Sequence, residues 1–187
     1  MVFLCVGAAK AGTSWLYRQL SAHPECHFRT IKELHYFDAL DDGTVARNLQ
    51  RIRARQIGLL ERSQGGLNAS SEQAKKIADG AEWLDVLEQD QEDIGAYLAY
   101  LRNGAEPAQV VGESTPAYAL LSAERLAQMA RMARDVRFLF LMRDPVERLW
   151  SHVRMIAGRR DTDGLVTAQR CDRLLARAIS GEESQIA

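Results

Sequence analysis

The clearest pattern in the chain is a short apolar run that ends at a glycine and leads into a helical pattern. Residues 2–6, Val-Phe-Leu-Cys-Val, are continuous and β-favouring, which is typical of a strand buried on both faces of a parallel sheet. Residues 13–22 then have helical leucine spacing, and His23-Pro24 closes that helix. A strand, a glycine-containing loop and a helix in this order predict the opening of an α/β nucleotide-binding fold.

Apolar spacing predicts the later elements as well. Residues 109–112 form a short strand candidate, and residues 136–142 an uninterrupted apolar run that predicts a buried strand. Helical spacing covers residues 47–62, 83–101, 122–133, 145–157 and 168–179. Alternating strands and helices predict an α/β, P-loop-NTPase-like three-layer fold with a central, mostly parallel sheet flanked by helices. In such sheets ligands bind beyond the carboxyl ends of the strands.

Composition narrows the class of protein. The length of 187 residues suits a single domain, residues 1–187, and a net charge of −1 gives no electrostatic basis for binding nucleic acid. No segment approaches the roughly 18 to 20 apolar residues that span a bilayer. The cysteines, Cys5, Cys26 and Cys171, lack CxxC spacing, and the N-terminus lacks a signal-peptide pattern, so we expect a cytoplasmic protein. No cluster with metal-ligand spacing appears, so we expect no metal.

The segment from Gly7 to Ser14, Gly-Ala-Ala-Lys-Ala-Gly-Thr-Ser, has the chemistry of a phosphate cradle. Glycines allow positive φ and close backbone approach, so consecutive N–H groups can converge on an anion at the start of a helix. Lys10 adds a mobile charge, and Thr13 and Ser14 add hydroxyl donors. The loop differs from a Walker A loop because no lysine directly follows Gly12.

Two further sets of residues have side chains that suit binding or catalysis, and each set also has a plainer structural interpretation. Arg143 and Ser151 combine an arginine fork with a hydroxyl, which suits a phosphate monoester; the alternative is an arginine that pairs with Glu147 at a helix start. Residues 32–37 contain Lys32, Glu33 and His35, which can supply an electrophile and a general base. The alternative there is a surface ion pair.

Together these blocks resemble the sulfotransferases that use 3'-phosphoadenosine 5'-phosphosulfate (PAPS), and are similar to bacterial members and to the domain of heparan sulfate sulfotransferases. The blocks occur in family order and cover the chain from about Val2 to Met155. They are Gly7-x-x-Lys10-x-Gly12-Thr13-Ser14-Trp15, Lys32-Glu33-x-His35-Tyr36-Phe37, Gly112-Glu113-x-Thr115-Pro116-x-Tyr118 and Arg143-Asp144-Pro145-x-x-Arg148-x-x-Ser151-His152.

The resemblance implies the donor site. Lys10, Ala11, Gly12, Thr13, Ser14 and Trp15 would bind the 5'-phosphosulfate, with Lys10 offsetting charge on the leaving oxygen. Arg143 and Ser151 would bind the 3'-phosphate. The product would be 3',5'-ADP, and the acceptor a small molecule or glycan that offers a hydroxyl, with an amine as second choice.

The resemblance also implies a base. Glu33 would remove the acceptor's proton while Lys32 positions the sulfuryl group. His35 competes for that role, because its ordinary pKa of roughly 6.5 suits a base at neutral pH better than the roughly 4.3 of a glutamate. Position in the family favours Glu33, and intrinsic chemistry favours His35.

The chain departs from the family at two points. Ser114 stands where heparan-type enzymes often carry lysine, which disfavours a heparan-like acceptor. Members usually continue beyond the position of Ala187 with another helix, a strand and a loop over the 3'-phosphate, so we expect the domain to lack its C-terminal part. A P-loop kinase or NTPase and a non-catalytic nucleotide-binding remnant are the alternative functions. Neither the acceptor nor the oligomeric state follows from the sequence.

Overall fold

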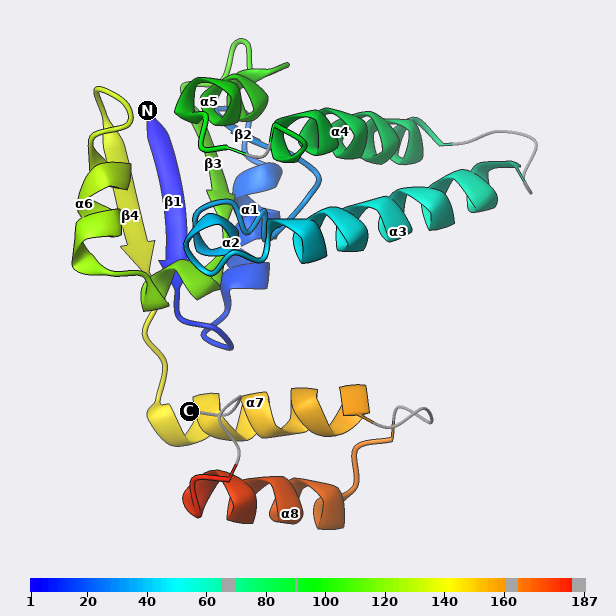
Figure 1. Cartoon of the computed structure of the whole chain (residues 1–187), viewed down its shortest axis with the longest axis vertical. Helices are drawn as coiled ribbons and strands as arrows, with labels where there is room; N and C mark the ends of the chain where they lie inside the picture. Colours follow the sequence, from blue (N-terminus) through cyan, green and yellow to red (C-terminus); the bar gives the residue numbers. More distant parts are fainter. Residues whose placement is uncertain (65–69, 90, 161–164, 183–187) are drawn as a thin grey trace. The chain divides into compact units, whose positions relative to one another are not determined.

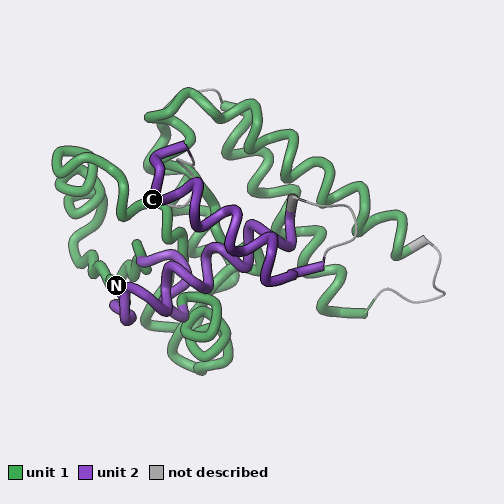
Figure 2. The backbone as a smooth tube through the Cα atoms, turned by 90° about the horizontal axis from the view of Figure 1, so that it is seen from below, with its two compact units in different colours: residues 1–7, 13–140 green, residues 8–12, 141–187 purple. Residues whose placement is uncertain are grey.

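The computed structural model describes residues 1–64, 70–89, 91–160 and 165–182. The chain divides into two compact units, shown in Figure 2. The first unit consists of Met1–Gly7 and Thr13–Phe140, and the second of Ala8–Gly12 and Leu141–Ala187. A single domain over residues 1–187 stays a prediction.

A four-stranded parallel sheet is the centre of the first unit (Figure 1). Its strands are β1 (Val2–Gly7), β2 (Cys26–Phe28), β3 (Val110–Ser114) and β4 (Val136–Phe140), in the order β2-β3-β1-β4. In the central pair, Leu4 of β1 lies opposite Glu113 of β3. Helices pack on the sheet, so the predicted α/β fold with a central parallel sheet is confirmed.

Aromatic contacts and apolar packing show how helices cover both faces of the sheet. The helices of this unit are α1 (Thr13–Ser21), α2 (Phe37–Asp41), α3 (Val45–Gln64), α4 (Ser71–Leu87), α5 (Ile94–Arg102) and α6 (Ala123–Ala130), with a 3-10 helix η1 (Pro116–Leu120). On one face Tyr17 of α1 packs edge-on against Phe28, and Phe28 against Phe3. The alternate β1 residues enter the main core on the other face, which contains Val2, Leu4, Val6, Ile52, Trp83, Tyr97 and Leu101.

The close approach of β1 and β3 depends on the absence of a side chain at Gly112. A Cβ atom at this position would lie 2.2 Å from the backbone oxygen of Phe3, far inside van der Waals contact. The glycine of this sequence block is therefore required by strand spacing in the sheet itself.

The structure corrects three element predictions. Residues 83–101 are two helices and not one, because Asp93 accepts a hydrogen bond of 2.9 Å from the Ala96 N–H and starts α5 as its N-cap. Strand β2, only three residues long, was not predicted because so short a segment has no readable period. Strand β4 lies at an edge of the sheet, and its Phe138 and Phe140 are exposed, so the prediction of a buried strand is wrong.

The second unit contains the helix pair α7 (Pro145–Arg160) and α8 (Ala168–Ile179), which pack around a small apolar core. That core consists of Val153, Ile156, Ala157, Cys171 and Leu174. The Asp144 carboxylate accepts a hydrogen bond of 2.9 Å from the Glu147 N–H, so Asp144 caps the start of α7. Across the described parts of both units, no helix is long and apolar enough to cross a membrane.

Candidate functional site

Each candidate block follows the carboxyl end of a different parallel strand. The Lys10 loop follows β1, the segment with Glu33 follows β2, and Arg143 follows β4. Glu113 lies at the end of β3 itself. The blocks therefore leave the sheet at the position where ligands bind in parallel α/β folds.

Backbone strain marks the same residues independently of any motif. Within the described residues, three non-glycine residues have positive φ: Lys10 at 68°, Glu33 at 64° and His35 at 53°. A left-handed backbone costs a residue other than glycine about 1 to 3 kcal/mol and persists only where the surroundings enforce it. All three belong to the predicted site.

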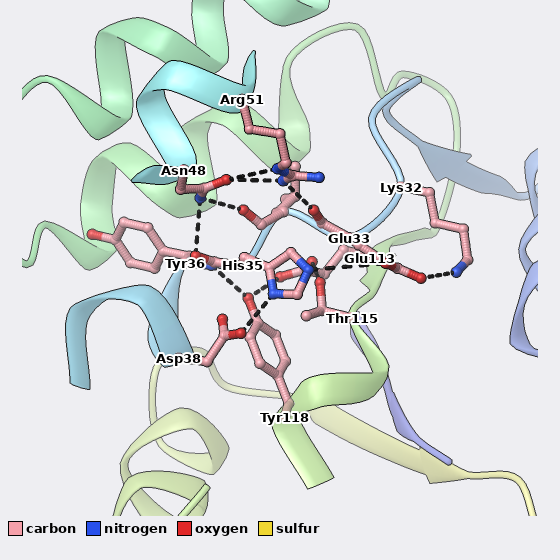
Figure 3. A network of polar contacts seen from close by, with 11 residues as sticks. Lys32, Glu33, His35, Tyr36, Asp38, Asn48, Arg51, Glu113, Thr115 and Tyr118 are labelled. Carbon is pink, nitrogen blue, oxygen red and sulfur yellow. Dashed lines mark hydrogen bonds and ion pairs between the residues drawn. The ribbon is translucent and has the colours of Figure 1, made fainter. Parts of the chain in front are cut away.

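Glu33 and His35 lie in one cluster of charged side chains, drawn in Figure 3. The Lys32 ammonium lies 2.5 Å from Glu33 Oε1. The His35 imidazole contacts Asp38 through Nδ1 at 2.6 Å and lies 3.9 Å from Glu33 Oε2 through Nε2. The structure thus brings Lys32, Glu33 and His35 together, and adds Asp38, which the sequence reading missed.

These contacts separate the pKa values of the two candidate bases. The interaction with the His35 imidazole, followed by the pairing with Lys32, lowers the pKa of Glu33 to about 2 against the opposing effect of burial. Asp38 first and Glu33 second raise the pKa of His35 to about 9. At neutral pH Glu33 is therefore an unprotonated carboxylate, and His35 already carries the proton that a base would have to accept.

Two residues of α3 hold the backbone of this loop. Asn48 Nδ2 donates to the carbonyl oxygens of Leu34 at 2.9 Å and His35 at 3.1 Å. Arg51 Nη2 donates to the Glu33 carbonyl oxygen at 3.0 Å. Sequence reasoning treated this segment only as an amphipathic helix. The sequence signal that could have identified the contact was an asparagine at the apolar spacing of this helix, one turn before Ile52.

The segment predicted to bind phosphate forms a tight turn directly before α1. Ala11 N–H closes a turn onto the Ala8 carbonyl oxygen at 3.1 Å, and Gly12 has a φ of 103° that favours glycine. Helix α1 begins directly afterwards with buried Thr13, followed by exposed Ser14 and Trp15. The first N–H groups of such a helix have no acceptor within the helix, so they can bind an anion.

Arg143 makes the pairing with Glu147 that was its plainer alternative, and it also contacts the backbone of Lys10. Its Nη1 donates to the Lys10 carbonyl oxygen at 3.3 Å, and its Nε and Nη2 bind Glu147 Oε2 at 3.2 and 3.0 Å. Ser151 lies one helical turn beyond Glu147 on α7. The guanidinium group therefore hydrogen-bonds to the backbone of the Lys10 loop, and two of its nitrogens are paired with the Glu147 carboxylate.

A family model described as the sulfotransferase family matches residues 3–181. The chain belongs to the sulfotransferase family. No curated protein and no solved structure matches it. Sulfotransferases in general transfer a sulfuryl group from PAPS to small-molecule or glycan acceptors, so membership supports an enzymatic transferase. In the part of the chain that the structure describes, no group of three or more His, Cys, Asp or Glu residues could hold a metal ion.

Proposed function

We propose that the chain transfers a sulfuryl group from PAPS to an acceptor hydroxyl and that Glu33 is the base. The acceptor oxygen attacks sulfur, the bond between sulfur and the bridging phosphate oxygen breaks, and 3',5'-ADP leaves. The acceptor proton moves to a Glu33 carboxylate oxygen. The observation that carries this proposal is the cluster in which Glu33 is unprotonated beside a protonated His35.

Lys32 has two partners in this reaction. Its ammonium pairs with Glu33 in the structure, and the sulfuryl oxygens of a bound donor are competing anions. As Lys32 turns toward the donor, the Glu33 carboxylate loses a cationic neighbour and its pKa rises toward the ordinary value. Donor binding thus makes Glu33 a stronger base at the moment when a base is needed.

The donor site in this proposal consists of the loop and helix start from Lys10 to Trp15, together with Arg143 and Ser151. Lys10 offsets charge that develops on the bridging oxygen, and backbone N–H groups bind the phosphosulfate. Arg143 and Ser151 bind the 3'-phosphate, which ATP lacks. The left-handed backbone at Lys10 supports a functional role for this loop.

Nucleotide preference tests the donor. We expect 3',5'-ADP to raise the melting temperature, since a ligand at about 100 times its Kd adds about 2.7 kcal/mol to the free energy of unfolding. Mg·ATP should leave the melting temperature unchanged. Stabilisation by Mg·ATP alone would support a kinase or NTPase and contradict the proposal.

Transfer itself is measured with ³⁵S-labelled PAPS and a panel of phenols, alkyl alcohols and glycans. Lys10→Ala should lower turnover by about two to three orders of magnitude, the scale for loss of one charge-stabilising donor. Lys76→Ala is the matched control, because Lys76 is a lysine that pairs with Glu72 on the surface of α4. Binding of 3',5'-ADP without transfer to any acceptor would indicate a non-catalytic remnant.

A further inference from the structure

A buried carboxylate at the end of β3 has no role in the proposed reaction. Glu113 is 3% exposed and accepts hydrogen bonds from three hydroxyl groups. These are Tyr97 at 2.6 Å and Tyr118 at 2.9 Å on Oε1, and Thr115 at 2.6 Å on Oε2. Burial raises the pKa of Glu113. Burial of a carboxylate costs free energy unless hydrogen bonds compensate it, and these hydroxyl groups supply that compensation.

Tyr118 connects this carboxylate to the loop that bears Glu33 and His35. Its hydroxyl donates to Glu113 and accepts a hydrogen bond of 3.1 Å from the Tyr36 N–H (Figure 3). Because a carboxylate only accepts, it directs the hydroxyl proton toward itself and leaves an oxygen lone pair facing the Tyr36 N–H.

The same end of β3 fixes a second backbone group, since the Glu33 N–H donates to the Ser114 carbonyl oxygen at 3.1 Å. Two N–H groups of the loop, at Glu33 and Tyr36, are therefore bound by β3 and by Tyr118. The loop that they hold contains the left-handed backbones of Glu33 and His35, which are unfavourable without such support.

We infer that Glu113, acting in part through Tyr118, is a positioning residue that holds the Glu33–His35 loop in its left-handed conformation. Its importance for turnover rests on the proposed function of Glu33. Release of the loop moves the Glu33 carboxylate and His35 away from their places in the charged cluster. Loss of that position lowers kcat and leaves the binding of 3',5'-ADP unchanged.

Two tyrosine variants separate positioning from general stability. Tyr118→Phe and Tyr97→Phe each remove one hydroxyl that binds Glu113 Oε1, and both tyrosines are 0% exposed. Of the two hydroxyls, Tyr118 accepts from the loop backbone at Tyr36. Tyr118→Phe should therefore lower kcat about tenfold or more, whereas Tyr97→Phe keeps it within about twofold. Equal kcat in the two variants would overturn the inference.

A second measurement does not depend on transfer. The charged groups that face His35 are Glu33, Asp38 and Arg51, and in the wild-type protein the His35 pKa is about 9. NMR titration of the imidazole should show a lower midpoint in Tyr118→Phe, nearer the ordinary value, and an unchanged one in Tyr97→Phe. Should the wild-type protein transfer no sulfate, the proposed function fails, and this titration still decides whether the loop is held.

Glu113→Leu provides a second variant if Tyr118→Phe does not fold. A leucine side chain has no acceptor, so the Tyr118 hydroxyl loses the group that directs its proton away from the Tyr36 N–H. We expect the same lower kcat and the same shift of the His35 titration. A folded Glu113→Leu protein with wild-type values in both measurements would contradict the inference.

Discussion

Glu33 and His35 belong to one left-handed loop, yet their neighbours move their pKa values in opposite directions. Lys32 and His35 stabilise the Glu33 carboxylate, while Asp38 and Glu33 stabilise the imidazolium of His35. A histidine with a pKa of about 9 is a poor base at neutral pH, because almost none of it is unprotonated. The ordinary pKa values of the two residue types, which favour His35, do not describe them in this protein.

The pH dependence of kcat/KM distinguishes the two bases. With Glu33 as base, kcat/KM should stay level from about pH 5 to about pH 8, because Glu33 is unprotonated throughout that range. With His35 as base, kcat/KM would rise about tenfold per pH unit up to its pKa of about 9. The measurement uses an alkyl alcohol acceptor, whose hydroxyl does not titrate in this range.

Variants test the same assignment. Glu33→Gln should lower turnover by about two to four orders of magnitude, the usual range for a general base. Wild-type turnover in Glu33→Gln, together with loss of turnover in His35→Ala, would show that His35 is the base.

Arg143 and Glu147 allow a test of the proposed 3'-phosphate site. Arg143→Ala should weaken binding of 3',5'-ADP about tenfold or more, since a charge-assisted hydrogen bond contributes about 1.5 to 3 kcal/mol. Glu147→Gln removes the negative charge that occupies part of the guanidinium fork, so binding should stay the same or tighten. Calorimetric titration measures both. If the two variants weaken binding equally, Arg143 serves only its pairing with Glu147.

At the scale of elements, Arg29 joins the end of β2 to two helices. Its Nη2 lies 2.8 Å from Asp79 and 2.5 Å from Glu82 on α4, and Nη1 donates to the Tyr100 carbonyl oxygen of α5 at 3.1 Å. The Arg29 side chain is 4% exposed. This contact secures the short strand from which the Glu33 segment continues.

Loss of the Arg29 side chain should destabilise the folded protein. Arg29→Met leaves the buried Asp79 carboxylate without its cation, so we expect the free energy of unfolding to fall by about 3 to 5 kcal/mol. Arg53→Met is the control, because the Arg53–Glu88 pair is exposed and such pairs contribute about 0 to 1 kcal/mol. Urea denaturation measures both, and similar losses would show that the Arg29 contacts are not a major source of stability.

The predictions for elements succeeded where the pattern was long and local. The strand starting at Val2 and the helix over Ala168–Ile179 follow from apolar spacing alone. The break before α5 and the three-residue β2 were missed, since a side-chain cap and a strand pairing leave little trace in hydrophobic period.

At the scale of the whole molecule, the two units differ in the size of their apolar cores. The first has a large core around Leu4 and Trp83, whereas the second relies on the few residues around Val153 and Cys171. Local opening is easier where fewer apolar contacts are lost.

Hydrogen exchange should reflect that difference. We expect backbone amides of α7 and α8 to exchange faster than those of β1 and β3, measured by mass spectrometry of peptides. Addition of 3',5'-ADP should slow exchange at Ala8–Gly12, with a peptide from α3 as the unaffected control. Uniform exchange across all helices and strands would contradict the unequal stability of the units.

The sequence by itself determined the parallel α/β architecture and predicted a phosphate-binding loop. Both depend on local order: an apolar strand, a turn rich in small residues, and a helix that starts directly afterwards. Four blocks in family order also identified the sulfotransferase family, which the match over residues 3–181 confirms.

The tertiary structure decided what surrounds Glu33. Asn48 and Glu113 lie far from the loop in the sequence, and Asp38 lies three residues after His35. Together they fix the protonation and backbone conformation of the loop. A pKa depends on distance and burial, and a left-handed backbone on partners that hold it, so neither can be inferred from spacing along the chain.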